Sequence, residues 1–206
     1  MVQYIYSITV FLFLFIPFTL WGQIKVISEK VENQELVDFF RFERIQYEKL
    51  SFTSKELKGK TFRLSVKEIW DGEVTKDSTF FDSRNADNNL PPGYTFTVSI
   101  NDTISTMRVI SKMTEDCKLK MQFSFAGCSL TKNFDAISSN DYSLRKAIER
   151  KTVEFGRKFY AFVYMLPYEK DNMKHYCAVE TSGKEIETWG KEFGIKHYLI
   201  FEMIIE

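Results

Sequence analysis

The sequence predicts an α+β fold: a mainly antiparallel sheet, arranged as a meander, with two main helices in a single compact domain that follows an N-terminal signal segment. Three observations support this fold class. Several runs alternate apolar and polar residues, as strands with one solvated face do. Turn signals such as Asp71-Gly72 and Asn101-Asp102 separate some of these runs, which favours hairpins and antiparallel neighbours. Two further segments have the 3.6-residue periodicity of helices.

The N-terminal segment, residues 1–22, is typical of a secretory signal peptide. It has no charged side chain, and residues 8–20 are almost wholly apolar. That length suits the apolar part of a signal peptide better than a membrane span, which needs about 20 residues. We therefore expect cleavage after Gly22, which leaves residues 23–206 as one α+β domain. An uncleaved membrane anchor is the alternative, because the uncharged stretch is just long enough to span a bilayer.

Composition places the chain among ordinary globular proteins. Of its 206 residues, 44% are hydrophobic and 27% are charged, a mixture that can build a core and is unlike that of a disordered chain. Lysine and arginine number 28, and aspartate and glutamate also number 28. With no net charge, there is no electrostatic basis for nucleic acid or an anionic membrane as the main partner.

The first main helix is predicted to start after Asn33, a good N-cap residue, and to run to about Leu50. A set of apolar residues falls on one face of that helix: Leu36, Phe39, Phe40, Tyr47 and Leu50. Glu43 lies inside this apolar stripe. A buried carboxylate there would have a raised pKa and could act as an acid or base. The alternative is a carboxylate at the edge of the stripe, paired with Arg44 or Lys49.

A run of strands is predicted next. In the first of them Phe62, Leu64 and Val66 alternate with polar residues, and the break of alternation at 68–70 indicates a bulge before the Asp71-Gly72 turn. The following strands are predicted over residues 73–81, 96–100, 103–110 and 118–125. The polar loop 82–93 contains oxygen ligands suited to calcium: Asp82, Asn85, Asp87, Asn88 and Asn89. It lacks the spacing of an EF-hand and is interpreted as a solvated loop.

The second main helix is predicted over residues 141–155, with Asn140 as its cap. Its apolar side contains Leu144, Ala147, Ile148 and Phe155, and Gly156 is suited to the position after its end. Two later runs, 159–165 and 198–205, are apolar on both faces, as central strands are. A shorter strand over 175–179 and a short helix over 185–193 complete the expected elements.

The cysteines are Cys117, Cys128 and Cys177. Cys117 and Cys128 enclose a predicted strand, so they would lie about 36 Å apart at roughly 3.3 Å per residue, against a limit near 7 Å between bridged Cα atoms. A bridge between them requires the chain to turn after Phe125. Free buried thiols are the preferred interpretation.

Motifs for chemistry are sparse. His175 and Cys177 fall on one face of a strand and His197 could join them, but a zinc site needs a fuller set of ligands, so we expect no metal. A nucleophilic pair of Cys177 and His197 has no local signature. No phosphate-binding, dinucleotide-binding or hydrolase motif occurs in the sequence, so no cofactor is expected and the catalytic residues, if any, are unknown.

These observations favour an exported protein of the cell envelope, periplasmic or extracellular, that serves as a non-catalytic binding or scaffold module for a protein or carbohydrate ligand. A carbohydrate ligand would require an exposed aromatic platform, for which Trp70, Tyr94 and Trp189 are candidates. One alternative is a small envelope hydrolase whose catalytic residues are dispersed in the sequence. The other is a single-span anchored interaction protein, in which case the uncleaved N-terminal segment would bind the membrane.

Overall fold

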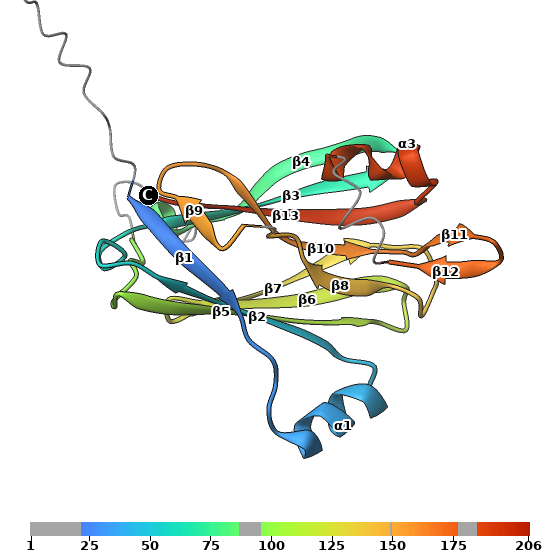
Figure 1. Ribbon diagram of the computed structural model, residues 1–206, viewed down its shortest axis with the longest axis horizontal. Helices are drawn as coiled ribbons and strands as arrows, with labels where there is room; N and C mark the ends of the chain where they lie inside the picture. Colours follow the sequence, from blue (N-terminus) through green and yellow to red (C-terminus); the bar gives the residue numbers. More distant parts are fainter. Residues whose placement is uncertain (1–21, 87–95, 149, 177–184) are drawn as a thin grey trace, which may run out of the picture.

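The structure is a computed structural model that describes residues 22–86, 96–148, 150–176 and 185–206, and it consists mainly of two antiparallel sheets (Figure 1). Sheet A has six strands in the order β7-β6-β5-β2-β1-β9 and sheet B has five in the order β4-β3-β13-β10-β8. The strands of sheet A are β1 (Gln23–Ser28), β2 (Gln46–Thr53), β5 (Ile104–Met113), β6 (Lys118–Phe125), β7 (Cys128–Asp135) and β9 (Thr152–Glu154). Those of sheet B are β3 (Phe62–Trp70), β4 (Glu73–Asp82), β8 (Ser143–Lys146), β10 (Phe159–Met165) and β13 (His197–Ile205).

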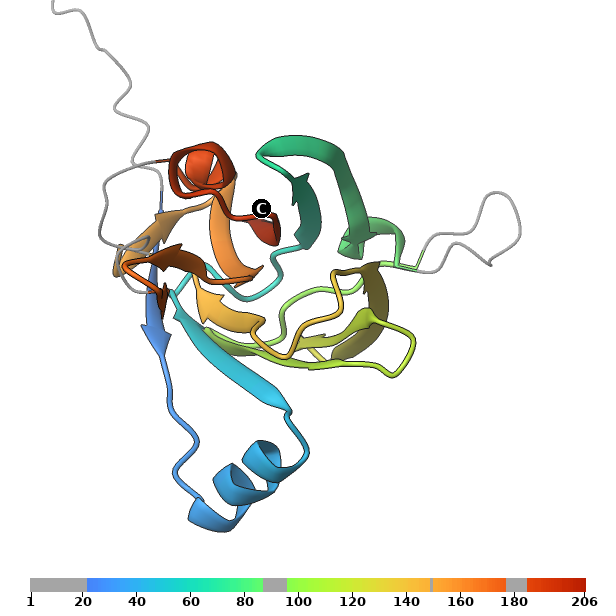
Figure 2. The ribbon, with the colours of Figure 1, turned by 90° about the vertical axis from the view of Figure 1, so that its right-hand side faces the viewer.

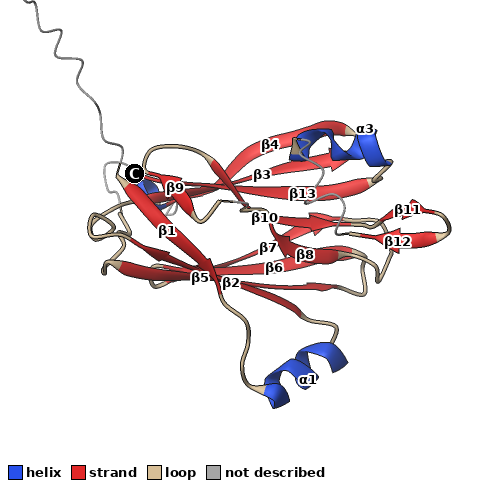
Figure 3. Ribbon diagram, in the orientation of Figure 1, coloured by secondary structure: helices blue, strands red, loops and turns tan. Residues whose placement is uncertain are grey.

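The remaining elements are short. Strands β11 (Tyr168–Lys170) and β12 (Met173–His175) form a separate hairpin. Two α-helices, α1 (Gln34–Phe42) and α3 (Trp189–Phe193), and two 3₁₀ turns, η1 (Ser83–Asn85) and η2 (Ile186–Thr188), complete the described part of the chain (Figure 3). The predicted α+β class, with mainly antiparallel sheet in one compact domain, is confirmed.

The core lies between the two sheets, which wrap around it in the end-on view of Figure 2. Inward residues of β6 and β3 alternate as predicted, and Phe123, Phe125 and Phe62 are almost completely buried. Aromatic rings from both sheets meet there: the ring centroids of Phe62 and Phe125 are 4.8 Å apart, and those of Phe123 and Phe201 are 5.1 Å apart. These contacts join sheet A to sheet B through apolar packing rather than backbone hydrogen bonds.

The first predicted helix starts where expected and ends early. Asn33 caps α1 by accepting a hydrogen bond from the backbone N–H of Leu36, at 3.0 Å. The helix ends at Phe42, and Arg44 adopts a left-handed backbone with φ of 53°. From Gln46 the chain forms β2, which pairs with β1 and β5 in sheet A. The prediction of a helix up to Leu50 was therefore wrong. Strand pairing on both sides of residues 46–53 outweighs the helical spacing, which beyond Phe42 was supported by Tyr47 and Leu50 alone.

The second predicted helix does not form. Residues 143–146 and 152–154 are the strands β8 and β9, which pair with β10 and β1. Leu144 is a strand residue whose side chain is buried in the core, so the apolar residue at this position contributes to the packing of sheet B.

The strand predicted over 96–100 is also absent from both sheets. That segment makes two backbone hydrogen bonds to η1, from Ala86 N–H to Phe96 O at 2.8 Å and from Val98 N–H to Ser83 O at 2.7 Å.

Sheet B is covered on its outer face by η2 and α3, within the region where a short helix was predicted. Trp189 is 3% exposed, and the Tyr198 hydroxyl donates to the Glu187 carbonyl at 3.0 Å while it accepts from the N–H of Gly190 at 3.1 Å. Gly190 also lies against the β3–β4 turn, where a Cβ atom at its position would be 2.6 Å from the Gly72 Cα. The close approach explains why glycine occupies both positions, and it holds α3 beside the turn.

Candidate functional site

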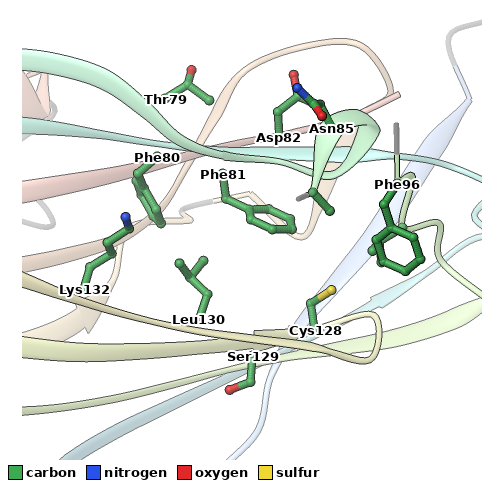
Figure 4. Close-up of a pocket in the computed structure, with 12 residues that line it drawn as sticks. Thr79, Phe80, Phe81, Asp82, Asn85, Phe96, Cys128, Ser129, Leu130 and Lys132 are labelled. Atoms are coloured by element: carbon green, nitrogen blue, oxygen red, sulfur yellow. The ribbon is translucent and has the colours of Figure 1, made fainter. Parts of the chain in front are cut away.

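A groove with a partly apolar lining lies where sheets A and B end on the same side, between β4 and β7 (Figure 4). We call this cavity of about 750 Å³ the seam groove. It is lined by residues of β4, of η1 and the segment that pairs with it, and of β7: Thr79, Phe80, Phe81, Asp82, Asn85, Ala86, Phe96, Val98, Cys128, Ser129, Leu130 and Lys132. Its volume is within the range of about 300–1,000 Å³ that is usual for small-molecule sites.

A β-bulge on β4 supplies one wall of the seam groove. Leu64 pairs with Phe81 while Ser65 pairs with Thr79, so Phe80 is the extra residue in the ladder. Because of this bulge Phe80 and Phe81 both contact the core: the Phe80 ring is 5.3 Å from that of Phe123, and the Phe81 ring is 5.4 Å from that of Phe62. Two consecutive aromatic side chains therefore line the edge of sheet B.

Strand β7 supplies the opposite wall. Its residues Cys128, Leu130 and Lys132 alternate with outward residues, and Lys132 pairs with the buried Met121 of β6. Lys132 is thus in phase with the inner face of a terminal strand, its side chain is exposed to solvent at the groove, and within the described part of the chain it makes no ion pair. An inward lysine also discourages edge-to-edge pairing of β7 with another chain, so the groove is suited to a small ligand more than to an added strand.

The other charged groups at the groove neutralise one another. The guanidinium of Arg84 donates to both carboxylate oxygens of Asp82, at 2.9 and 2.6 Å, and lies 3.1 Å from Glu206. The hydrogen bond from Arg84 lowers the pKa of Asp82, which stays ionised and paired. Since Asp82 is already balanced by Arg84, Lys132 is the unpaired charged side chain among the described residues that line the groove.

The thiol that lines the groove, that of Cys128, is not an activated nucleophile. Burial raises the pKa of Cys128, which keeps its thiol protonated at neutral pH and weakly reactive. Cys117 and Cys128 are both free and lie at opposite ends of the β6–β7 hairpin, as the strand-length argument predicted. Cys177 lies outside the described residues.

The histidines and Glu43 that the sequence singled out are not brought together. Glu43 is exposed at the C-cap of α1, whereas His175 belongs to β12 and His197 to β13. Helix α1 projects from sheet A, away from both of these strands (Figure 1). His175 is half-buried and stacks on Tyr168 in the β11–β12 hairpin. His197 is completely buried in the core. Among the residues that the structure describes, no three metal-ligating side chains are grouped so as to hold a metal ion.

The imidazole of His197 is hydrogen-bonded on one side only. Its Nδ1 lies 2.5 Å from the Tyr142 hydroxyl, which also accepts a hydrogen bond from the backbone N–H of Ile137 at 3.1 Å. Its Nε2 is buried and has no hydrogen-bond partner among the described residues. The ring packs on Trp70, with 4.0 Å between ring centroids. This is a neutral, structural histidine inside the core.

We expect acid to destabilise the protein through His197. Burial lowers the pKa of His197 to about 4, whereas an unfolded chain would hold it near 6.5. Between those values the unfolded state binds the proton and the folded state does not, so stability is greatest above pH 6.5 and falls toward pH 4, by about 3 kcal/mol in total. Urea unfolding at pH 7, 6, 5 and 4.5 measures the slope. His197→Gln should remove it, and His175→Asn should leave it; a slope unchanged in His197→Gln would contradict this assignment.

The aromatic platform expected for a carbohydrate does not form from the described candidates. Trp189, the first residue of α3, is buried, and Trp70 is half-buried and packs against His197. Tyr94 lies outside the described residues, as do Asp87, Asn88 and Asn89 of the loop considered for calcium. Of the remaining loop residues, Asp82 caps η1 by accepting from the N–H of Arg84.

Comparisons with protein-family models, with curated proteins and with solved structures gave no significant match. None of the helices within residues 22–86, 96–148, 150–176 and 185–206 is long and apolar enough to cross a membrane.

Proposed function

We propose that this protein is a non-catalytic binding module of the cell envelope that holds an elongated apolar molecule with one anionic group, such as a long-chain carboxylate, in the seam groove. The observation that carries the proposal is the pairing of an aromatic-lined groove with an inward lysine that has no partner in the described chain. Burial of an acyl chain against Phe80, Phe81 and Leu130 would supply affinity at about 25 cal/mol per Å² of apolar surface. Lys132 would orient the carboxylate.

The chemistry of the lining supports binding rather than catalysis. A hydrolase needs a nucleophile or an activated water beside a general base. Both histidines are absent from the groove lining, and the thiol of Cys128 is held protonated by burial. The carboxylate of Asp82 is occupied by Arg84. The proposed export to the cell envelope rests on a single feature, the uncharged apolar segment before Gly22.

The test is equilibrium binding to the chain from Gln23 to Glu206. A fluorescent long-chain fatty acid is titrated with the protein, and dodecanoic acid and dodecan-1-ol are then used as competitors. We expect the acid to compete better than the alcohol. In Lys132→Met, the dissociation constant for the acid should rise about tenfold, because an ionic hydrogen bond contributes about 1.5 kcal/mol or more, while that for the alcohol should not change.

The matched control is Lys120→Met, which removes an exposed lysine from the outer side of the same sheet. It should leave both competitors unchanged. If neither the acid nor the alcohol displaces the probe, the groove is not a site for apolar ligands. If both bind and Lys132→Met weakens them equally, the groove binds apolar molecules but Lys132 does not select a carboxylate.

A further inference from the structure

Residues 29–45, which we call the arm, project from sheet A as a loop that carries α1 (Figures 1 and 2). None of the residues of α1 is buried. Its apolar side chains are unusually open to solvent: Leu36 is 41% exposed, Phe39 is 53% exposed and Phe42 is 83% exposed. Three large apolar side chains exposed on one short helix favour an interaction site.

The helix gains little support from its own chain. Phe40 stacks on Tyr47, with ring centroids 5.6 Å apart, and the Asn33 cap closes the first turn. Isolated helices shorter than about 12–15 residues are marginal in water, and α1 has nine residues. Packing of the face formed by Leu36, Phe39 and Phe42 against another surface would therefore stabilise both the helix and the contact.

A second cavity, of about 900 Å³, lies between the arm and the outer face of sheet A, and we call it the arm groove. Its apolar floor and wall include Leu36, Tyr47 and Ile110. A nine-residue helix is about 13 Å long and about 10 Å across, which corresponds to roughly 1,000 Å³. The arm groove therefore has about the size of one helix such as α1.

The charges of the arm groove and of α1 are complementary. Lys49 is paired with Glu29 at 2.5 Å, but Arg108 on β5 is exposed and makes no ion pair within the described residues. On α1, Glu35 lies beside the apolar face and likewise has no ion pair in the described part of the chain. A helix like α1 in the arm groove could place its glutamate near the free arginine.

We propose that the arm is a homodimer interface, in which α1 of each copy lies in the arm groove of the other. The helix and the groove belong to the same part of one chain, so a two-fold axis makes both contacts at once and closes the assembly. A lipid surface fits less well, because residues 29–44 contain five acidic and three basic side chains and would be repelled by anionic lipids. This inference does not depend on the ligand proposed for the seam groove.

The experiment measures the mass of the chain from Gln23 to Glu206 by sedimentation equilibrium between about 1 and 200 µM, the range in which a dimer of modest interface dissociates. We expect a reversible dimer. Phe39→Asp and Phe42→Asp should each raise the dimer dissociation constant at least tenfold without lowering the melting temperature at concentrations where the wild-type chain is monomeric. Met173→Asp is the matched control, since Met173 is a 59% exposed apolar residue outside the arm and should leave the dimer unchanged.

A charge exchange tests the contact itself. Glu35→Arg and Arg108→Glu should each weaken the dimer, and the double variant should recover most of the loss, because the pair is rebuilt with reversed sign. A chain that stays monomeric at 200 µM overturns the proposal. So does a dimer that is insensitive to both Phe substitutions, or one in which the double charge variant is no stronger than the single ones. Adsorption of a monomeric chain to vesicles of neutral phospholipid would assign the arm to a membrane instead.

Discussion

Replacement of Lys67 by methionine is expected to lower the free energy of unfolding by about 3–5 kcal/mol, the usual cost of removing one partner from a buried ion pair. Lys67 lies on the outer face of β3, and its side chain is only 14% exposed. Its ammonium nitrogen is 2.5 Å from Glu187 Oε1 and 3.3 Å from Glu202 Oε1, and the Glu202 side chain is 4% exposed. Urea denaturation at pH 7 gives the difference in unfolding free energy between the variant and the wild-type chain.

The size of that effect follows from where the charges lie. Burial opposes the ammonium of Lys67, but its hydrogen bond to Glu187 and the charge of Glu202 outweigh burial and raise its pKa above the usual value. Lys67 also lowers the pKa of Glu187, which accepts a further hydrogen bond from the Tyr160 hydroxyl at 2.8 Å. The network joins β3, β10 and β13 to η2, so its loss would weaken the packing of η2 on sheet B. It would also leave Lys158 as the remaining ion-pair partner of Glu202 among the described residues.

Two variants delimit this prediction. Lys118→Met removes a pair with Asp135 in which the two side chains are 41% and 67% exposed, so it should cost less than about 1 kcal/mol. The double variant Lys67→Met with Glu202→Leu should regain part of the stability, because no buried carboxylate is then left beside an apolar side chain. An equal cost for Lys67→Met and Lys118→Met would show that the buried network contributes no more than a surface pair.

Local patterns predict the strands whose two faces differ in exposure. Leu119, Met121, Phe123 and Phe125 of β6 are all buried and alternate with more exposed polar residues, so the period of two reports the inner face directly. The Asp71-Gly72 turn is equally local: both residues have positive φ, 49° and 81°, as a two-residue hairpin turn requires. Such signals depend only on neighbours in the sequence.

The second helix was mispredicted because its pattern is ambiguous over a short segment. Leu144, Ala147 and Ile148 have helical spacing, but Leu144 pairs with Tyr164 of β10, which lies 20 residues later in the chain. Residues 46–53 likewise form β2 because they pair with β1 and β5. Tertiary pairing of this kind outweighs local preference, which spans less than about 1 kcal/mol per residue.

The seam groove had partial signals in the sequence. Phe80 and Phe81 are adjacent aromatic residues at the end of a predicted strand, and such doubling interrupts the alternation as a bulge does. Lys132 falls in phase with Cys128 and Leu130, at an inward position. That β4 and β7 end their sheets side by side could not be predicted, because this depends on the order of strands that are distant in the chain.

Phe201→Ala is expected to lower the free energy of unfolding by about 3–5 kcal/mol, which is the usual range for truncating a buried phenylalanine. Phe201 is 2% exposed on β13, the central strand of sheet B. Its ring centroid lies 5.1 Å from Phe123 and 5.5 Å from Phe134 in sheet A, and 6.2 Å from Phe80. The ring is thus a contact between the two sheets, and its removal leaves a cavity that the neighbouring strands cannot close.

The position of Phe201 also links the core to the seam groove, since Phe80 rests on it and lines the groove from the other side. Phe201→Ala should therefore weaken binding of a fatty-acid probe under conditions where the variant is still folded, in addition to lowering its urea midpoint. Phe42→Ala removes the same side chain from a site that is 83% exposed and, at concentrations where the chain is monomeric, should change stability by no more than about 0.5 kcal/mol. A loss below about 1 kcal/mol for Phe201→Ala would mean that sheets A and B are not held together by a close-packed core at this point, and that the wall of the groove formed by Phe80 is supported by β4 alone.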